Sequence, residues 1–117
     1  MIDFTINNKD FNLLITVQGF YSQKIPPATR VPKDIPFYMY NMSKNYKNIN
    51  FMYIKDIHQI WYHGGLTGSG TIMDYVHKIK LFLNKYNFPK VYIIGSSAGG
   101  YGAILIGQIL KLDKIIA

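Results

Sequence analysis

The sequence predicts an α/β fold, with a mainly parallel sheet and helices on both faces of that sheet. Two observations carry this prediction. Apolar runs of strand length alternate with helix-like stretches in the second half of the chain, which is typical of a parallel sheet covered by helices. Residues 13–17 (LLITV) are almost continuously apolar, as expected of a strand buried on both faces. A chain of 117 residues forms one domain at most.

The first two expected strands cover residues 3–6 and 11–17 and are joined by a tight turn. Asn and Asp residues between them tolerate positive φ and suit such a turn. Four prolines then fall within eleven residues, which excludes a regular helix before Pro36. Because proline fits the first turn of a helix, a short helix is expected over residues 36–45.

The middle of the chain predicts a third strand over residues 51–54, a loop rich in aromatic residues and glycine, and a helix over residues 71–86. The apolar residues of that helix recur at alternating spacings of four and three, which places them on one face. They are Ile72, Val76, Ile79, Leu83 and Tyr86. Thr71 with Asp74 resembles a capping box at the start of the helix.

The last part of the chain predicts a strand over residues 91–94, a glycine-rich turn, a helix to about Lys111 and a further strand from residue 114. The helix is apolar almost all round, so we expect it to be buried. The loops that follow the parallel strands then gather at one edge of the sheet. Ligand sites in open α/β sheets lie at that edge.

The turn at residues 95–99 reads GSSAG and matches the pattern G-x-S-x-G. Between a strand and a helix, this pattern is typical of a nucleophile elbow, a sharp turn that projects its serine alone at the end of the sheet. Ser97 is therefore the candidate nucleophile. Gly95 and Gly99 are the elbow glycines that leave room for the turn.

A serine nucleophile also needs backbone donors for the oxyanion that forms during acyl transfer. The Ala98 N–H is one candidate, and Phe20 supplies the other, because the second donor usually comes from the loop after an earlier central strand. The segment His63-Gly64-Gly65 looks like the HGG oxyanion motif of lipases. It follows the third strand, however, which favours a role in lining a pocket. The candidate pocket residues are Trp61, Tyr62, His63, Gly64, Gly65 and Tyr101.

The base that would accept the serine proton is left open by the sequence. In this arrangement the histidine usually comes after the nucleophile, but the last histidine is His77 and the one acid beyond the nucleophile is Asp113. We expect His77 on a solvated helix face and Asp113 in a turn at the other end of the sheet. Asp56 with His58, or His63, are alternative candidates within the chain.

Composition argues against several other classes of function. The chain carries 13 Lys and Arg against 6 acids, but these basic residues are scattered and form no nucleic-acid footprint.

There is no cysteine and no convincing metal-ligand spacing, so neither a metal nor another cofactor is expected. The glycines match neither a P-loop nor G-x-G-x-x-G, although a helix N-terminus behind glycines can still bind an anion. No signal peptide or span of bilayer length is found, so we expect a cytoplasmic protein with no membrane partner.

Three segments together carry a family resemblance: QGF at residues 18–20, the aromatic loop at residues 61–65, and IGSSAGGYGA at residues 94–103. On these residues the chain resembles the α/β-hydrolase superfamily, and most closely its small serine esterase-like or acyltransferase-like domains. The resemblance covers roughly residues 13–117. It implies Ser97 as nucleophile, with the Ala98 and Phe20 amides as oxyanion hole, and a small-molecule or glycan ester as substrate.

The resemblance also implies an incomplete domain over residues 1–117. Members usually continue with two or more strands whose loops carry the acid and the histidine, so we expect both beyond residue 117 and an inactive isolated chain. An oligomer or a partner is then expected to cover the C-terminal edge strand. The alternatives are a non-catalytic hydrolase-like scaffold or interaction module, and an anion- or nucleotide-binding domain.

Overall fold

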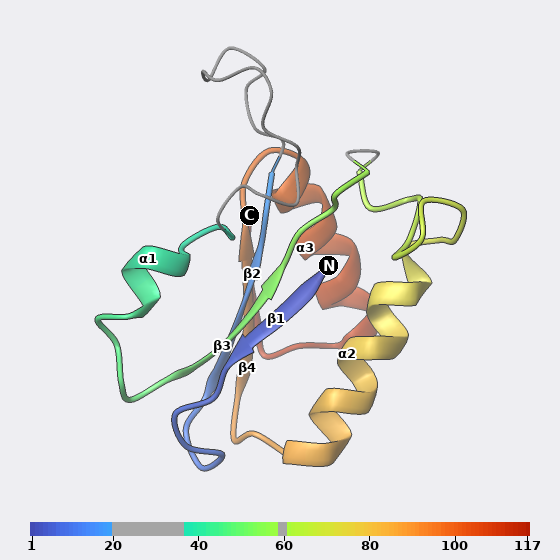
Figure 1. Cartoon of the computed structure of the whole chain (residues 1–117). Helices are drawn as coiled ribbons and strands as arrows, with labels where there is room; N and C mark the ends of the chain where they lie inside the picture. The colour runs from blue at the N-terminus through green and yellow to red at the C-terminus, as the bar shows by residue number, and fades with distance from the viewer. Residues whose placement is uncertain (20–36, 59–60) are drawn as a thin grey trace.

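The computed structural model of the chain describes residues 1–19, 37–58 and 61–117 (Figure 1). Within these residues, five strands form one mixed sheet and three helices pack on it. The strands are β1 (Ile2–Thr5), β2 (Leu13–Val17), β3 (Asn50–Ile54), β4 (Val91–Gly95) and β5 (Lys114–Ile116). The helices are α1 (Tyr40–Ser43), α2 (Met73–Tyr86) and α3 (Ala98–Leu110).

The strand order in the sheet is β1-β3-β2-β4-β5. Strand β2 lies at the centre and runs parallel to β3 and β4, with Ile15 opposite Met52 and Ile93. Strand β5 is parallel to β4, whereas β1 is antiparallel to β3. The carboxyl ends of β2, β3 and β4 therefore meet at one edge of the sheet.

The first two strands are joined by the predicted turn but are not neighbours. The Phe11 N–H donates to the Asn8 carbonyl at 3.0 Å, which closes the turn. Strand β3 nevertheless lies between β1 and β2. Burial explains this order, because the apolar β2 needs a neighbour on each side, while the half-exposed β1 tolerates the edge of the sheet.

The helices lie on both faces of the sheet, with α1 on one face and α2 and α3 on the other (Figure 1). On the α1 face, the Tyr53 ring packs edge-on against Tyr40 with 5.2 Å between centroids, and its hydroxyl lies 2.6 Å from the Ser43 hydroxyl. On the opposite face, Met52 and Ile54 belong to the main apolar core together with side chains of α2 and α3.

Helix α2 confirms the predicted amphipathic helix, although its first turn differs from the expected capping box. The helix begins at Met73, whose N–H donates to the Thr71 hydroxyl at 3.2 Å. The Asp74 carboxylate accepts instead from the Leu66 N–H at 3.1 Å. Asp74 therefore fastens the preceding loop to the helix.

Two expectations about the other helices need correction. Helix α3 is not buried all round: Ile104 and Ile109 are 41% and 45% exposed, because the sheet and α2 cover only the side that carries Ala103 and Ile106. Helix α1 begins at Tyr40, later than predicted, after Met39 at a positive φ of 63°. Pro36, the expected first residue of that helix, lies outside the described residues. In the part of the chain that the structure describes, no helix has both the length and the apolar character needed to cross a membrane.

Candidate active site

Ser97 occupies the turn between β4 and α3 in a backbone conformation that residues other than glycine rarely adopt. Its φ is 56° and its ψ is −129°, and its side chain is exposed. No hydrogen bond from the Ser97 hydroxyl caps the helix. Such strained conformations cluster at functional sites, where the surrounding structure holds them in place. Ser97 is therefore exposed to solvent on a turn whose backbone is held between β4 and α3.

The two elbow glycines are required because this turn brings three backbone segments into contact. A Cβ on Gly95 would overlap the carbonyl group of Gly99. A Cβ on Gly99 would overlap the Val17 carbonyl oxygen, at the end of β2. The glycines thus let the first turn of α3 lie directly on β4 and on the end of the central strand.

The loop after β2 meets the elbow at Gly19. A Cβ built on Gly19 would lie 2.9 Å from the Ser96 carbonyl oxygen and 3.6 Å from the Ser97 Cβ. Ala98 is buried and is the first residue of α3, so its N–H is one of those that have no carbonyl partner within the helix. Phe20, the other predicted oxyanion donor, lies outside the described residues.

The aromatic loop after β3 is anchored to the same edge of the sheet through Tyr62. Asp56 accepts hydrogen bonds from the backbone N–H groups of Tyr62 at 2.9 Å and His58 at 3.0 Å. The Tyr62 hydroxyl donates to the Gln18 carbonyl. Burial, together with the neighbouring Tyr75 and Asp56, raises the pKa of Tyr62 far above its ordinary range, so this hydroxyl stays protonated and donates.

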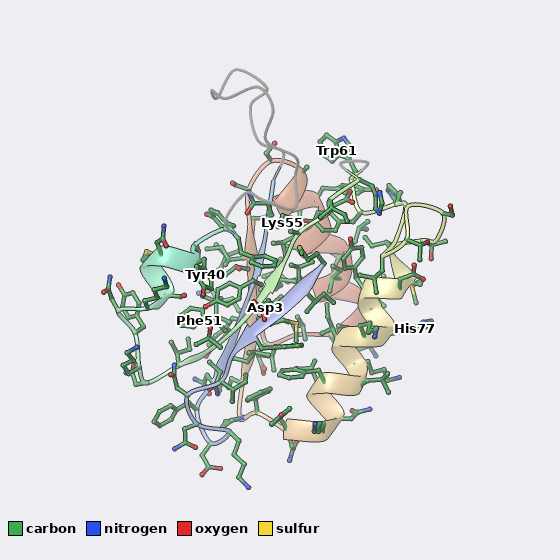
Figure 2. All side chains as sticks on the ribbon, viewed as in Figure 1. Asp3, Tyr40, Phe51, Lys55, Trp61 and His77 are labelled. Carbon is green, nitrogen blue, oxygen red and sulfur yellow. The ribbon has the colours of Figure 1, made fainter. Side chains whose placement is uncertain are left out.

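Trp61 and Tyr62 both have positive φ, of 57° and 68°. Two successive strained residues need strong anchoring, which the contacts of Tyr62 with Asp56 and Gln18 provide. Figure 2 shows Trp61 at the end of the sheet where β4 turns into α3. The strain therefore lies beside the elbow.

His63, Trp61 and Tyr101 form an aromatic cluster one helical turn from Ser97. The His63 Nε2 lies 2.6 Å from the Tyr101 hydroxyl, and the Trp61 ring meets the Tyr101 ring edge-on with 5.5 Å between centroids. The Tyr101 N–H donates to the Ser97 carbonyl at 3.1 Å. The structure thus brings three of the predicted pocket residues together next to the candidate nucleophile.

Gly64 and Gly65, the other predicted pocket residues, are buried inside their own loop. Gly64 accepts a hydrogen bond from the Gly70 N–H at 2.7 Å. Gly65 has a φ of 62°, and a Cβ there would overlap the Asp74 carboxylate. This packing gives both glycines a structural role in closing the loop against α2.

The candidate acids and bases are spread over the molecule. Asp56 and His58 form a turn in which the carboxylate binds the His58 backbone N–H. Figure 2 shows His77 on the outer side of α2, directed away from the sheet, as predicted. Asp113 accepts from the Val91 N–H at 2.7 Å, at the end of β4 opposite the elbow. His63 contacts α3 directly, through the Tyr101 hydroxyl one helical turn after Ser97.

The sequence did not predict the roles of two residues that build the site. Gln18 supplies the carbonyl that holds Tyr62, and Asp74 ties the glycine-rich loop to α2. A backbone carbonyl leaves no mark in a sequence, so Gln18 could not be found. Asp74 carried a signal, because an acid in a first helical turn after a glycine-rich loop can accept from the N–H groups of that loop.

Among the described residues, no group of three or more His, Cys, Asp or Glu side chains is placed to hold a metal ion. Comparison of this chain with protein-family models, with curated proteins and with solved structures finds no match.

Proposed function

We propose that the chain is a serine hydrolase or acyltransferase domain of the α/β-hydrolase type, with Ser97 as its nucleophile. The observation that carries this proposal is the Ser97 backbone, with φ 56° and ψ −129° between a parallel strand and a helix. A nucleophile elbow requires this strained strand-to-helix turn, with its serine hydroxyl exposed. The parallel pairing of β2, β3, β4 and β5, with helices on both faces, supports the hydrolase-like fold.

The contact between Gly19 and the elbow supports the proposed oxyanion hole. The donors in this proposal are the N–H groups of Ala98 and Phe20. Since Gly19 lies against Ser96 and Ser97, the chain is already beside the nucleophile one residue before Phe20. Two backbone donors on the same side of the serine are what a developing oxyanion requires.

The proposed reaction is acyl transfer from a small-molecule or glycan ester. The Ser97 Oγ attacks the ester carbonyl carbon while a base takes the hydroxyl proton. The base gives this proton to the leaving alkoxide, which departs as the alcohol. Water, or an acceptor hydroxyl, then attacks the acyl-enzyme carbonyl and loses its proton to the base, and the base returns that proton to the departing serine Oγ. Within the described residues, His63 is the proposed base, because its partner Tyr101 lies one turn from Ser97.

Covalent labelling with a fluorophosphonate probe tests the nucleophile. The matched control is Ser96→Ala, because Ser96 is the exposed neighbour in the same turn. We expect slow labelling of the wild type and of Ser96→Ala, and no labelling of Ser97→Ala, since an oxyanion hole alone retains part of the catalysis. Slower labelling of His63→Gln would support the proposed base, and equal labelling would reject it.

The second candidate function is a non-catalytic hydrolase-like scaffold or interaction module. The observation that favours it is that the His63 Nε2 is already bonded to the Tyr101 hydroxyl, at 2.6 Å. Absence of labelling in the wild type at any probe concentration would reject the nucleophile and favour the scaffold.

A further inference from the structure

A groove between β1 and α2 lies away from the elbow, and of the loop after β3 only Leu66 is among its described lining residues. Its volume is about 510 Å³, within the roughly 300–1,000 Å³ of ligand pockets. Ile2 and Phe4 of β1 and Met52 of β3 line one side of the groove, and Leu81 and Phe82 of α2 line the other. Of the proposed catalytic residues that the structure describes (Ser97, Ala98 and His63), none lines it.

The walls of the groove are apolar and in part open to solvent. The Phe4 and Phe82 rings stack with 4.1 Å between centroids, yet Phe4 remains 41% exposed. Leu81 is 70% exposed, more than any other large apolar side chain among the described residues. Covering these side chains would remove apolar surface from water, which stabilises a complex by about 25 cal/mol per Å².

Two lysines of α2, Lys78 and Lys85, also line the groove, and none of its described lining residues is an Asp or Glu. They are seven residues apart, or about two helical turns, and therefore share one side of the helix. The Lys85 ammonium lies 5.3 Å from the centroid of the Tyr86 ring. In the adjoining hollow, the Asp74 carboxylate accepts from the Leu66 N–H, and His77 lies beside Lys78 on the helix.

We propose that this groove binds a monomeric long-chain carboxylate, such as a fatty acid. The apolar walls take the alkyl chain, and one of the two ammonium groups pairs with the carboxylate at the rim. The formal net charge of +7 adds a favourable field for an anionic ligand. This inference does not depend on the proposed esterase or acyltransferase activity.

Isothermal titration of the full 117-residue chain with dodecanoate, below the concentration at which it forms micelles, tests the proposal. We expect one saturable site, with dodecanol and dodecyltrimethylammonium binding about threefold to fivefold more weakly because they lack the anionic group. Equal affinity for the cationic amphiphile would overturn the assignment. Binding to anionic vesicles without binding of the monomer would overturn it in favour of a membrane surface.

Two variants locate the binding in this groove. Leu81→Glu places a negative charge beside the ligand carboxylate, and because Leu81 is largely exposed the fold should tolerate the change. We expect it to abolish dodecanoate binding, and Lys78→Gln with Lys85→Gln to weaken binding about threefold to fivefold. Lys80→Gln, on the same helix but outside the groove, is the matched control and should bind as the wild type does.

The outcome for Ser97→Ala separates this site from the elbow. We expect Ser97→Ala to bind dodecanoate as the wild type does, because no elbow residue lines the groove. Loss of binding in Ser97→Ala, or unchanged binding in Leu81→Glu with a native circular dichroism spectrum, would overturn the proposal. Neither result would bear on fluorophosphonate labelling.

Discussion

At the residue scale, Ser97 stores backbone strain that its neighbours maintain. A non-glycine residue in a sparsely populated region of φ and ψ costs roughly 1–3 kcal/mol. The turn cannot relax, because Gly95 is packed against the backbone at the start of α3, and Gly99 against the backbone at the end of β2. Sequence alone predicted this local feature, since the pattern G-x-S-x-G and the flanking apolar runs lie within one short segment.

Replacing Ser97 by glycine should therefore stabilise the protein while removing the proposed nucleophile. Glycine adopts positive φ without a Cβ penalty, so Ser97→Gly should raise the free energy of unfolding by about 1 kcal/mol relative to Ser97→Ala, which keeps the Cβ. The serine hydroxyl makes no capping hydrogen bond to α3, so its loss should not offset this gain. Urea unfolding of both variants measures the difference. Equal stability would show that the turn is unstrained.

At the element scale, the sequence predicted α2 well and α3 only in part. A regular spacing of apolar residues predicts which face of α2 meets the core, and the structure places Val76 and Ile79 there. Helix α3 has no such contrast, because its own apolar residues lie all around its circumference. Only the packed structure distinguishes its buried side, with Ile106, from its exposed side, with Ile104 and Ile109.

Helix α3, with Ile104 and Ile109 exposed, contacts β5 at the edge of the sheet. Exposed apolar side chains and a strand edge both promote association. Ile104→Lys with Ile109→Lys should therefore raise the concentration at which the chain remains monomeric, with a change in unfolding free energy of about 1 kcal/mol or less. Sedimentation velocity and urea unfolding measure the two quantities.

Ile106→Ala is the contrasting variant, because Ile106 is fully buried. It should lower the free energy of unfolding by about 2–5 kcal/mol, as large-to-small changes in a core do. A loss of this size in the Ile104→Lys, Ile109→Lys variant would mean that the outer side of α3 is also part of the core.

At the scale of the whole molecule, the sequence predicted that the loops after the parallel strands share one edge of the sheet, but it did not predict the strand order or the contacts that join these loops. The position of β3 between β1 and β2 follows from burial on both sides of β2 and not from any local pattern. The contact of Gly19 with the elbow, and the link from Asp56 through Tyr62 to Gln18, join residues far apart in the chain. The strained turn at Ser97 was predictable for the opposite reason, because its pattern is local.

The buried tyrosines Tyr62 and Tyr75 predict that the fold loses stability in alkali. Burial is the main cause that raises the pKa of each above its ordinary range, with Asp56 and other neighbours adding to it. Above about pH 10 the unfolded chain releases phenolic protons that the folded chain retains. The stabilisation is therefore fully present below that pH and is lost as the pH rises.

Tyr75→Phe separates this effect from general alkaline titration. Among the described residues the Tyr75 hydroxyl has no hydrogen-bond partner, so its removal should leave stability at about pH 8 unchanged or slightly higher. Above about pH 10, the unfolding free energy of Tyr75→Phe should fall less steeply with pH than that of the wild type, because one fewer proton is released on unfolding. Tyr46→Phe, at an exposed tyrosine, should keep the wild-type slope. Urea unfolding across this pH range measures the slopes, and equal slopes for Tyr75→Phe and the wild type would mean that Tyr75 titrates normally in the fold.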